Sequence, residues 1–497
     1  MSSQALPPVP TQLFINNEYK NSTSPTTTLT LTNPATGTAL PYKLQIADKP
    51  EIDSAVAHAT SAYKTTWAAF TPAQRSKCML RFADLVEAHA ERLAVLESLS
   101  TGKPVSPTRG FDLAHMVEVW RYYAGWTDKL AGDTYPPSTP DGVYKIVRRE
   151  PLGVCAGIAS WNATFLYIGW KIAPAVAAGN CFIFKPSEKA PFGALALGEL
   201  FKEAGFPAGV VQIVNGEANT GALLASHPGI AKISFTGSVA GGKAVQELAT
   251  RSNMKKVTLE LGGKSPAIIF DDGEDKGKAL ERALGGVCGF LFNSGQVCVA
   301  TSRVLVQSSI FDKFCAGIKA AFKGAEATLG ADPLSPSTQF GPIVDKAQFD
   351  KIMGYIDIGK KTATLLTGGA QHGTQGFFIK PTIFTHPDPS SPIVREEIFG
   401  PVMVIQPFES EEDAIQMAND SVYGLAASIY TSNVDRALRV SSRLECGGVA
   451  VNSPFLPQVD TPFGGCKASG LGRELGRDGI LEYTEPKSVH IKLDAKL

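Results

Sequence analysis

Neither acidic nor basic residues are concentrated anywhere in this sequence of 497 residues. Its 47 basic residues balance 47 acidic residues, and no long run of either sign occurs. A nucleic-acid groove or a membrane-binding face requires a local excess of basic residues. We therefore expect neither nucleic acid nor a membrane among the partners of this protein.

Long apolar runs are also missing. No segment is long and apolar enough to span a bilayer, and residues 1–12 lack the basic start and the apolar core of a signal peptide. We therefore expect a cytoplasmic protein. The last three residues, Ala495, Lys496 and Leu497, are a conservative variant of the Ser-Lys-Leu peroxisomal address, so the peroxisomal matrix stays open as an alternative compartment.

Cysteine and histidine occur without the spacing that metal sites need. The eight cysteines include no C-x-x-C pair, and the seven histidines show no metal-ligand pattern. We predict that the protein binds no metal. Reduced thiols are expected, which agrees with an intracellular compartment.

The length and the pattern of apolar segments predict an α/β protein with more than one lobe. A chain of 497 residues is too long for a single core. Short apolar segments at 153–159, 181–184, 210–214 and 232–235 alternate with helical stretches, which is typical of βαβ units and a parallel sheet. A second α/β lobe, with strands at 303–307 and 403–406, is expected from residue 262 to about 467. Residues 77–100 read as amphipathic and helical.

One cysteine lies where a nucleophile would be expected. Cys298 follows the apolar run 286–292 and a glycine-containing turn, and its neighbours are Val297 and Val299. A thiol has an ordinary pKa of about 8.5, so it needs a nearby base or a donor-rich, water-excluded site to react at neutral pH. The alternative for a lone cysteine is a small buried hydrophobe.

Two other stretches favour the nucleophile. Glu260 lies in the apolar segment 257–261, just before paired glycines, and a carboxylate among leucines is costly unless it is paired or acts as a base. Asn162 follows the strand predicted at 153–159, where its amide could hold an oxyanion.

In this order and spacing, the three residues resemble the aldehyde dehydrogenase superfamily. Four motifs of such enzymes occur in order over nearly the whole chain. They are L-E-L-G-G-K-S-P at 259–266, N-x-G-Q-x-C at 293–298, E-E-I-F-G-P-V at 396–402 and P-F-G-G-x-K-x-S-G-x-G-R-E at 462–474. The resemblance implies a Rossmann-like cofactor domain, a second α/β catalytic domain and a β-ribbon oligomerisation element.

The domain boundaries follow from this resemblance. We expect an NAD-binding domain at 1–129 and 151–261, a catalytic domain at 262–467, and an oligomerisation element at 130–150 and 468–497. In similar enzymes a strand like 143–150 pairs with the last strand, here 488–493. The resemblance therefore implies a homodimer or a homotetramer.

The resemblance also implies the chemistry. The Cys298 thiolate would add to an aldehyde, the Asn162 amide and the Cys298 backbone N–H would hold the oxyanion, and Glu260 would activate the water that hydrolyses the thioester. Glu474 corresponds to a residue that helps to relay protons in some relatives. Its alternative is a surface ion pair with Arg473 or Arg477.

The cofactor implied by the resemblance is NAD. Lys185 and Glu188 would hold the adenosine ribose, and the Glu188 carboxylate would repel the 2′-phosphate of NADP. On the sequence alone, 185–188 could equally be a solvated helix start. By resemblance, Glu397 binds the nicotinamide ribose and Phe399 packs near that ring.

A phosphate site is predicted where the segment 232–235 ends. Gly237 and Gly242 permit close backbone approach, and a helix that begins at Ser238 would direct free N–H groups at a phosphate. The spacing differs from G-x-G-x-x-G. Without the resemblance, a plain strand–turn–helix is an equal alternative.

The chain departs from the family after Asn162, where an aromatic residue and then proline are usual. Ala163 should widen the substrate tunnel, and Thr164 should loosen a turn that proline would fix. The other positions that match tunnel walls could also be plain core, but as a set they predict an aromatic tunnel without an arginine for a substrate carboxylate. They are His115, Trp120, Tyr167, Trp170, Phe292, Phe455 and Phe463.

Two other functions are compatible with such a fold. A non-catalytic protein would not need Cys298, Glu260 and Asn162 together. A CoA-acylating enzyme would transfer the acyl group to CoA, and such enzymes commonly lack the glutamate base. Both alternatives are therefore less favoured than a hydrolytic, NAD-dependent aldehyde dehydrogenase acting on a small-molecule aldehyde.

Overall fold

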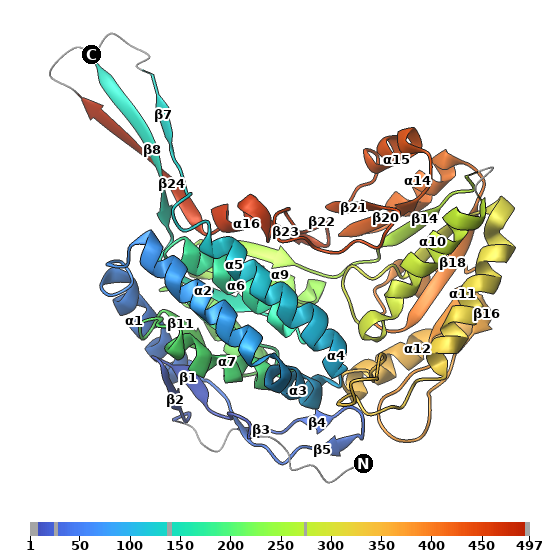
Figure 1. Cartoon of the computed structure of the whole chain (residues 1–497), viewed down its shortest axis with the longest axis horizontal. Coiled ribbons are helices and arrows are strands. Elements are labelled where there is room, and N and C mark those ends of the chain that lie inside the picture. Colours follow the sequence, from blue (N-terminus) through green and yellow to red (C-terminus); the bar gives the residue numbers. More distant parts are fainter. Residues whose placement is uncertain (1–7, 24–27, 137–141, 273–275, 493–497) are drawn as a thin grey trace.

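The structure is a computed structural model that describes residues 8–23, 28–136, 142–272 and 276–492. It contains two large sheets and a long ribbon that projects away from them (Figure 1). The proposed peroxisomal tripeptide at 495–497 lies outside the described residues.

The first sheet forms the core of the half of the molecule that contains the N-terminal helices. In order across the sheet, its strands are β2 (Glu18–Lys20), β1 (Leu13–Ile15), β11 (Val211–Ile213), β10 (Cys181–Lys185), β9 (Val154–Ile158), β12 (Lys232–Thr236), β13 (Lys256–Glu260) and β23 (Gly470–Leu471). The strands from β11 to β13 pair in parallel, and they include all four strands predicted for this lobe.

Two groups of helices pack on this sheet. One group comprises α1 (Lys49–Lys64), α8 (Ala218–Ser226) and α9 (Val239–Ser252), and the other comprises α2 (Pro72–Ala88), α3 (Ala90–Thr101), α5 (Ala114–Ala124), α6 (Thr164–Ala177) and α7 (Pro191–Glu203). The helical segment predicted at 77–100 is therefore two helices. The break lies at His89, whose backbone (φ −104°, ψ 11°) leaves the α-helical region.

The second sheet forms the core of the other half. In order, its strands are β16 (Thr364–Thr367), β17 (Thr382–Thr385), β18 (Val402–Phe408), β15 (Arg303–Gln307), β14 (Pro266–Ile269), β20 (Ala426–Tyr430) and β21 (Gly448–Val451). The helices around it include α10 (Lys276–Cys288), α11 (Phe311–Glu326), α12 (Lys346–Thr362), α14 (Glu411–Asn419) and α15 (Val434–Ser441). The two sheets confirm the predicted α/β fold with two lobes.

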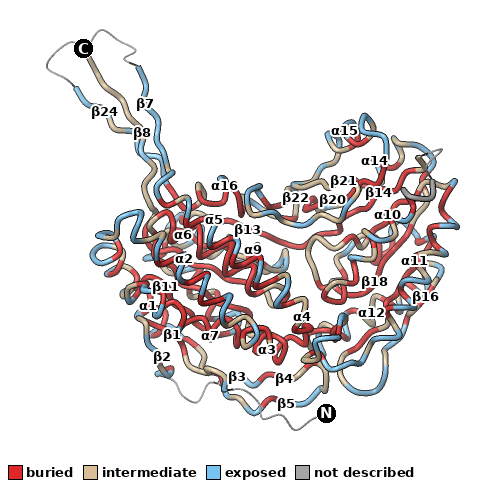
Figure 2. The backbone as a smooth tube through the Cα atoms, in the orientation of Figure 1, coloured by how far each residue is buried: buried red, intermediate tan, exposed pale blue. Residues whose placement is uncertain are grey.

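The ribbon pairs distant parts of the chain. β8 (Val143–Pro151) pairs antiparallel with β24 (Thr484–Lys492) along its whole length, and β7 (Asp133–Tyr135) pairs with the other side of β8. This confirms the predicted pairing of the strand at 143–150 with the last strand, which already begins at Thr484. Buried residues are concentrated around the two sheets, whereas the ribbon is exposed or half-buried (Figure 2).

The parallel register brings several strand ends to one edge of the first sheet. Thr236 of β12 lies opposite Glu260 of β13, and Ile158 of β9 lies opposite both Phe235 and Lys185. Residues that follow β9, β10, β12 and β13 therefore meet at this edge, which is where ligands bind in open parallel sheets.

Two properties concern the described residues only. None of the helices among them is long and apolar enough to cross a bilayer. Within the same ranges, no group of three or more histidine, cysteine, aspartate or glutamate side chains could hold a metal ion.

The pairing of β23 with β13 depends on Gly470, which lies directly opposite Glu260. Its φ is +149°, and a Cβ added there would lie 2.1 Å from the Leu259 carbonyl oxygen. We predict that Gly470→Ala lowers the free energy of unfolding by roughly 2 kcal/mol or more, because β23 must move away from β13.

Gly354→Ala is the matched control for this prediction. Gly354 lies inside α12, and an added Cβ would have no neighbour within 4 Å. Alanine there should raise the free energy of unfolding by roughly 0.5–1 kcal/mol through helix propensity. Denaturant titrations measure both changes, and equal stabilities of the two variants would contradict the prediction.

Candidate active site

A cleft of about 550 Å³ lies at the edge of the first sheet where the strand ends meet. Its lining comes from the turn after β9, from Thr236 to Ser238 after β12, and from Glu260 to Gly262 at the end of β13. The second lobe contributes Cys298, Glu397 and Phe399. The two lobes therefore share one cleft.

A distorted segment brings Cys298 into this cleft. The short helix η3 (Gly289–Gly295) is kinked, because Asn293 (φ 48°) and Ser294 (φ 53°) have left-handed backbone conformations. The chain then turns at Gln296, whose side chain donates to the Asn293 carbonyl and accepts from the Val344 backbone N–H. Side-chain hydrogen bonds thus fix the loop that precedes the thiol.

The Cys298 thiol contacts the Glu260 carboxyl. Burial, and then the charge of Glu260, raise the pKa of the thiol well above its ordinary value. Burial is also the largest cause that raises the pKa of Glu260, to about 8, and the charge of Glu474 adds to it. Among the described residues, Glu260 Oε1 has no hydrogen-bond partner. The carboxyl can therefore accept a proton from the thiol or from a water molecule.

The side-chain amide of Asn162 is held in one orientation. Its Oδ1 accepts hydrogen bonds from the Ser160 hydroxyl at 2.6 Å and from the Tyr167 hydroxyl at 3.1 Å. Because both bonds are made to the oxygen, the amide NH₂ is available to another acceptor. Asn162, Tyr167 and Cys298 line both the cleft and a second pocket, so the two cavities meet at these residues.

That second pocket has a volume of about 500 Å³ and an almost entirely apolar lining. Tyr167, Trp170, Phe292 and Phe463 line it as predicted from the sequence, and Ala163 does so as well. Its further lining residues are Lys103, Phe111, Asp112, Leu166, Val297, Val299, Leu456 and Pro457. We refer to this pocket as the tunnel.

The other predicted tunnel residues lie behind the wall. His115 accepts a hydrogen bond from the Trp170 indole N–H at 3.0 Å, and Phe455 stacks on Phe463 with ring centroids 6.3 Å apart. Trp120 is fully buried and packs against Phe82 and Phe201, so it belongs to the core. Burial lowers the pKa of His115 to about 4, and the ring is therefore neutral at physiological pH.

Sequence reasoning missed Lys103, Phe111 and Asp112. Phe111 lies four residues before His115 and stacks against it, so helical spacing could have identified it. The ion pair of Lys103 with Asp112 is almost fully buried. It crosses from the end of α3 to the π-helical turn η1 (Thr108–Leu113), and no sequence pattern indicates that contact.

Glu474 is not a surface residue. Its side chain is 5% exposed, and Oε1 accepts hydrogen bonds from Lys171 Nζ at 2.5 Å and from the Ser234 hydroxyl at 3.0 Å. Arg473 instead donates to the carbonyl oxygens of Gly465 and Gly472. The alternative of a surface ion pair with Arg473 or Arg477 is therefore wrong, because the β-bridge between Phe463 and Glu474 turns the carboxyl inwards.

The comparisons with known proteins agree with this geometry. Residues 19–489 match the aldehyde dehydrogenase family. The chain belongs to the aldehyde dehydrogenase family. The chain is therefore an NAD-dependent enzyme that oxidises an aldehyde to the carboxylic acid, and the predictions of an enzyme and of NAD as cofactor are confirmed.

Relatives cover nearly the whole chain. An aldehyde dehydrogenase of Emericella nidulans is 44% identical over 486 residues, which are 97% of this chain and 95% of the relative. Retinal dehydrogenase 2 of Rattus norvegicus is 44% identical over 491 residues, which are 98% of this chain and 92% of the relative.

Solved structures show the same fold. The aldehyde dehydrogenase KauB from Pseudomonas aeruginosa is 39% identical with a TM-score of 0.93, covering 98% of this chain and 97% of that one. An indole-3-acetaldehyde dehydrogenase complexed with NAD⁺ is 38% identical with a TM-score of 0.93, again covering 98% and 97% of the two chains.

The side of the aldehyde dehydrogenase cleft opposite the tunnel fits NAD. α9 begins after Ser238, whose hydroxyl accepts from the Gly241 N–H, and the N-terminal end of this helix lies beside the cleft. Thr236 Oγ1 is buried and has no hydrogen-bond partner among the described residues. The Glu397 carboxylate accepts from the Gly263 N–H at 2.8 Å, and a Cβ on Gly262 would lie only 2.4 Å from it. These groups offer N–H donors to phosphate and acceptors to ribose hydroxyls.

Gly242, Lys185, Glu188 and Phe399, the other residues predicted to bind the cofactor, lie at separate positions around the cleft and the strand ends. Gly242 packs against Leu261 and is not part of the cleft lining, so its lack of a side chain serves the packing of α9 on β13. Lys185 is 3% exposed and donates to the Pro186 carbonyl, so the solvated helix start is wrong for this residue. Glu188 is half-buried near the same strand end. Phe399 (φ 58°) packs edge-on against Trp161 in the cleft.

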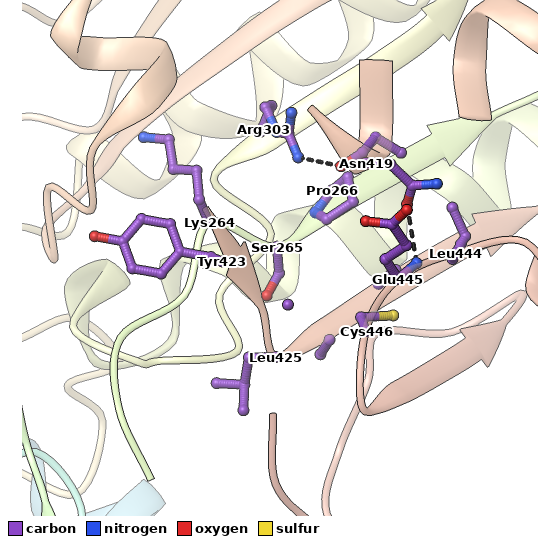
Figure 3. Close-up of a pocket in the computed structure, with 14 residues that line it drawn as sticks. Lys264, Ser265, Pro266, Arg303, Asn419, Tyr423, Leu425, Leu444, Glu445 and Cys446 are labelled. Atoms are coloured by element: carbon purple, nitrogen blue, oxygen red, sulfur yellow. Dashed lines mark hydrogen bonds between the residues drawn. The ribbon is translucent and has the colours of Figure 1, made fainter. Parts of the chain in front are cut away.

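A third pocket, of about 280 Å³, is lined by Lys264 and Ser265, which follow Gly262 and Gly263 in the chain, and by other residues of the second lobe (Figure 3). Arg303 donates there to the carbonyl oxygens of Met417 and Ala418, which end α14. In the view of Figure 3, the side chains of Lys264 and Tyr423 extend away from Glu445 and Cys446. Burial lowers the pKa of Lys264 to about 7. Cys298, Glu260 and Asn162 do not line this pocket, so we do not assign the aldehyde to it.

The contact between Cys298 and Glu260 predicts how the thiol responds to pH. Because the Glu260 charge raises the pKa of the thiol, Glu260→Gln should move the midpoint of Cys298 alkylation by iodoacetamide to lower pH. Rates measured across a pH series, with Cys298→Ala as the blank for the other thiols, give this midpoint. A midpoint that is unchanged or moves to higher pH would show that Glu260 does not act on the thiol in this way.

Proposed function

We propose that this enzyme oxidises uncharged, apolar aldehydes to carboxylic acids by way of a thioester on Cys298, which water hydrolyses. The observation that carries the proposal is the position of Cys298. Its thiol contacts Glu260 and lies where the apolar tunnel meets the cleft that fits NAD. An aldehyde in the tunnel would present its carbonyl carbon to the sulfur.

In the first step, Glu260 takes the thiol proton and the Cys298 sulfur forms a bond to the carbonyl carbon. The oxygen becomes an oxyanion, which the Asn162 amide and the Cys298 backbone N–H stabilise. Asn162 is buried, which strengthens its hydrogen bond to the oxyanion. NAD, when bound, supplies the acceptor for the hydride that leaves this carbon, and the residue left on Cys298 is a thioester.

Before the second step, Glu260 must pass on the proton that it took from the thiol, and this proton must leave a buried site. Glu260 then removes a proton from the attacking water and returns it to the Cys298 sulfur, which leaves as the carboxylic acid forms. Glu474 raises the pKa of Glu260, and it contacts both Lys171 and Ser234. This arrangement supports Glu474 as the group that helps to pass the proton on.

The tunnel lining supports the substrate class. It contains no arginine among the described residues, and its one lysine, Lys103, is paired with Asp112. The Tyr167 hydroxyl and the Trp170 N–H are also engaged, with Asn162 and His115. A carboxylate on the substrate would lose its hydration without gaining a partner, whereas apolar and aromatic groups would bury favourably.

For the cofactor, we propose that Lys185 and Glu188 hold the adenosine ribose, that Gly237, Ser238 and the start of α9 face the phosphates, and that Glu397 and Phe399 adjoin the nicotinamide riboside. The half-buried Glu188 carboxylate supports a preference for NAD over NADP, because it would face the 2′-phosphate of NADP.

We also propose three domains: an NAD-binding domain at 1–129 and 151–261, a catalytic domain at 262–467 and an oligomerisation element at 130–150 and 468–497. The ribbon would make the enzyme a homodimer or homotetramer. In the described residues β24 pairs on one side only, which leaves an open edge for a second copy. Light scattering of the intact protein tests this, and a monomer would contradict it. The cytoplasm and the peroxisomal matrix stay predictions from the sequence.

Turnover should depend on whether the aldehyde carries a charge. NADH formation should be faster with an arylacetaldehyde than with an ω-carboxylated aliphatic aldehyde by roughly 100-fold or more in kcat/KM, because the tunnel offers no free cation. CoA should not accelerate turnover. Cys298→Ala is the control and should be inactive. Acceleration by CoA with an acyl-CoA product would instead indicate the acylating reaction.

The Glu260→Gln variant should separate the two chemical steps. Glu260→Gln should still give a single burst of NADH from enzyme preincubated at alkaline pH, where the thiol ionises without help, but steady turnover should fall by roughly 100-fold or more because water is not activated. Stopped-flow absorbance of NADH measures both phases. A variant that turns over normally would remove Glu260 from the mechanism.

A further inference from the structure

The backbone carbonyl of Asn162 is held by two side chains from distant parts of the chain. Lys103 Nζ donates to this oxygen at 3.3 Å, and Asn293 Nδ2 donates to it at 3.2 Å. Both donors and the carbonyl are buried. Asn162 is thus fixed at its carbonyl by these two residues and at its side-chain amide by Ser160 and Tyr167.

Asn293 also reaches the loop that carries the nucleophile. Its Nδ2 lies 3.3 Å from the Gln296 carbonyl, two residues before Cys298. The Gln296 backbone N–H and side-chain Nε2 each donate back to the Asn293 carbonyl at 3.0 Å. One amide group therefore bridges the Asn162 turn and the Cys298 loop.

The left-handed backbone of Asn293 makes this bridge possible. With φ 48° and ψ 33°, its side chain turns back towards the Asn162 turn. Asparagine is one of the few residues other than glycine that adopt this conformation readily. Glycine would adopt it too, but it has no amide to donate.

The Lys103 side chain is buried, so its ammonium group hydrogen-bonds inside the protein, in part to the same Asn162 carbonyl. Its side chain is 3% exposed, it forms an ion pair with Asp112, and its ammonium lies 5.1 Å from the centroid of the Phe292 ring. The positive charge strengthens its hydrogen bond to the Asn162 carbonyl relative to a neutral donor.

The residues that follow Asn162 make such support necessary. Ala163 (φ −153°, ψ 52°) and Thr164 lead into α6, and neither has the ring that would fix φ of the turn. The Thr164 hydroxyl interacts with the buried Glu97 carboxyl of α3, so it anchors the start of α6.

We propose that Asn293, with Lys103, is a positioning residue that sets the Asn162 amide relative to the Cys298 backbone N–H. This inference rests on the proposed roles of Asn162 and Cys298. The two oxyanion donors belong to different lobes, and Asn293 is the side chain that hydrogen-bonds to the backbone on both sides. Its effect on the reaction is exerted through Asn162.

The test uses Asn293→Asp, which keeps the size of the side chain and tolerates the left-handed backbone but removes both N–H donors. We expect the rate of the NADH burst to fall by roughly 10–100-fold, which is less than the loss expected for removing an oxyanion donor itself. Alkylation of Cys298 by iodoacetamide forms no oxyanion, so its rate should change by no more than about twofold.

Asn253→Asp is the matched control. Asn253 Nδ2 also donates to two backbone carbonyls, those of Pro228 and Ile230, and it lies at the end of α9, outside the cleft and the tunnel. This substitution should leave the burst rate unchanged. An equal loss in both variants would attribute the effect to general destabilisation and would overturn the inference.

A double-mutant cycle decides whether Asn293 acts through Asn162. In an Asn162→Ala background, where the amide is already absent, Asn293→Asp should cause little further loss of burst rate. An undiminished loss in that background, or a parallel loss of alkylation, would mean that Asn293 only supports the Cys298 loop. If Asn162→Ala itself leaves the burst unchanged, the proposed role of Asn162 fails, and this result is distinguishable from a failure of the positioning role of Asn293.

Lys103→Met combined with Asp112→Asn tests the second donor without leaving a buried unpaired charge. The pair keeps similar side-chain volumes next to Phe292. The burst should slow in this variant too, and adding Asn293→Asp should have a non-additive effect, because both donors bind one carbonyl oxygen. Fully additive effects would show that Lys103 does not act together with Asn293 on the Asn162 carbonyl.

Discussion

The contact between the Cys298 thiol and the Glu260 carboxyl constrains the whole site. Burial raises the pKa of both groups, and the charge of Glu260 raises the pKa of the half-buried thiol further, so the cleft disfavours a thiolate beside an ionised Glu260. A proton that leaves the sulfur therefore passes to the carboxyl. Once the sulfur is acylated it carries no charge, and Glu260, after it has released this proton, can act as a base towards water.

The rest of the fold brings these two groups together from different lobes. Glu260 ends β13 in the first sheet, and the chain then crosses through Gly262 and Gly263 to β14 in the second. Glu397 rests on these glycines, and the Ser469 hydroxyl donates to the Gly262 carbonyl from the other side. A Cβ on Gly263 would lie 2.4 Å from the Cys298 carbonyl oxygen. The absence of side chains at this crossing is what permits the approach.

The tunnel shows how selectivity can arise from satisfied polar groups. Lys103 forms an ion pair with Asp112, the Trp170 N–H donates to His115 and the Tyr167 hydroxyl donates to Asn162. These three groups are therefore already paired and do not bind a charged substrate. Aromatic rings supply the remaining wall, so the tunnel discriminates mainly through the cost of desolvating charge.

The sequence by itself determined the family, the chemistry and the strands, because these depend on local patterns. The strand ending at Glu260, the glycines after it and the turn before Cys298 are contiguous segments whose residue types are meaningful alone. The sequence also indicated the pairing of the two ribbon strands, through resemblance. Only the tertiary structure decided which polar groups are paired. From the sequence, Glu474 could be a proton-relay residue or part of a surface ion pair with Arg473 or Arg477, whereas the structure shows its carboxyl bound to Lys171 and Ser234. Likewise, Lys103, Asp112 and Asn293 meet Asn162 across large separations in the chain. Periodicity carries no information on such contacts, because they are set by packing between elements and by the need to satisfy buried charge.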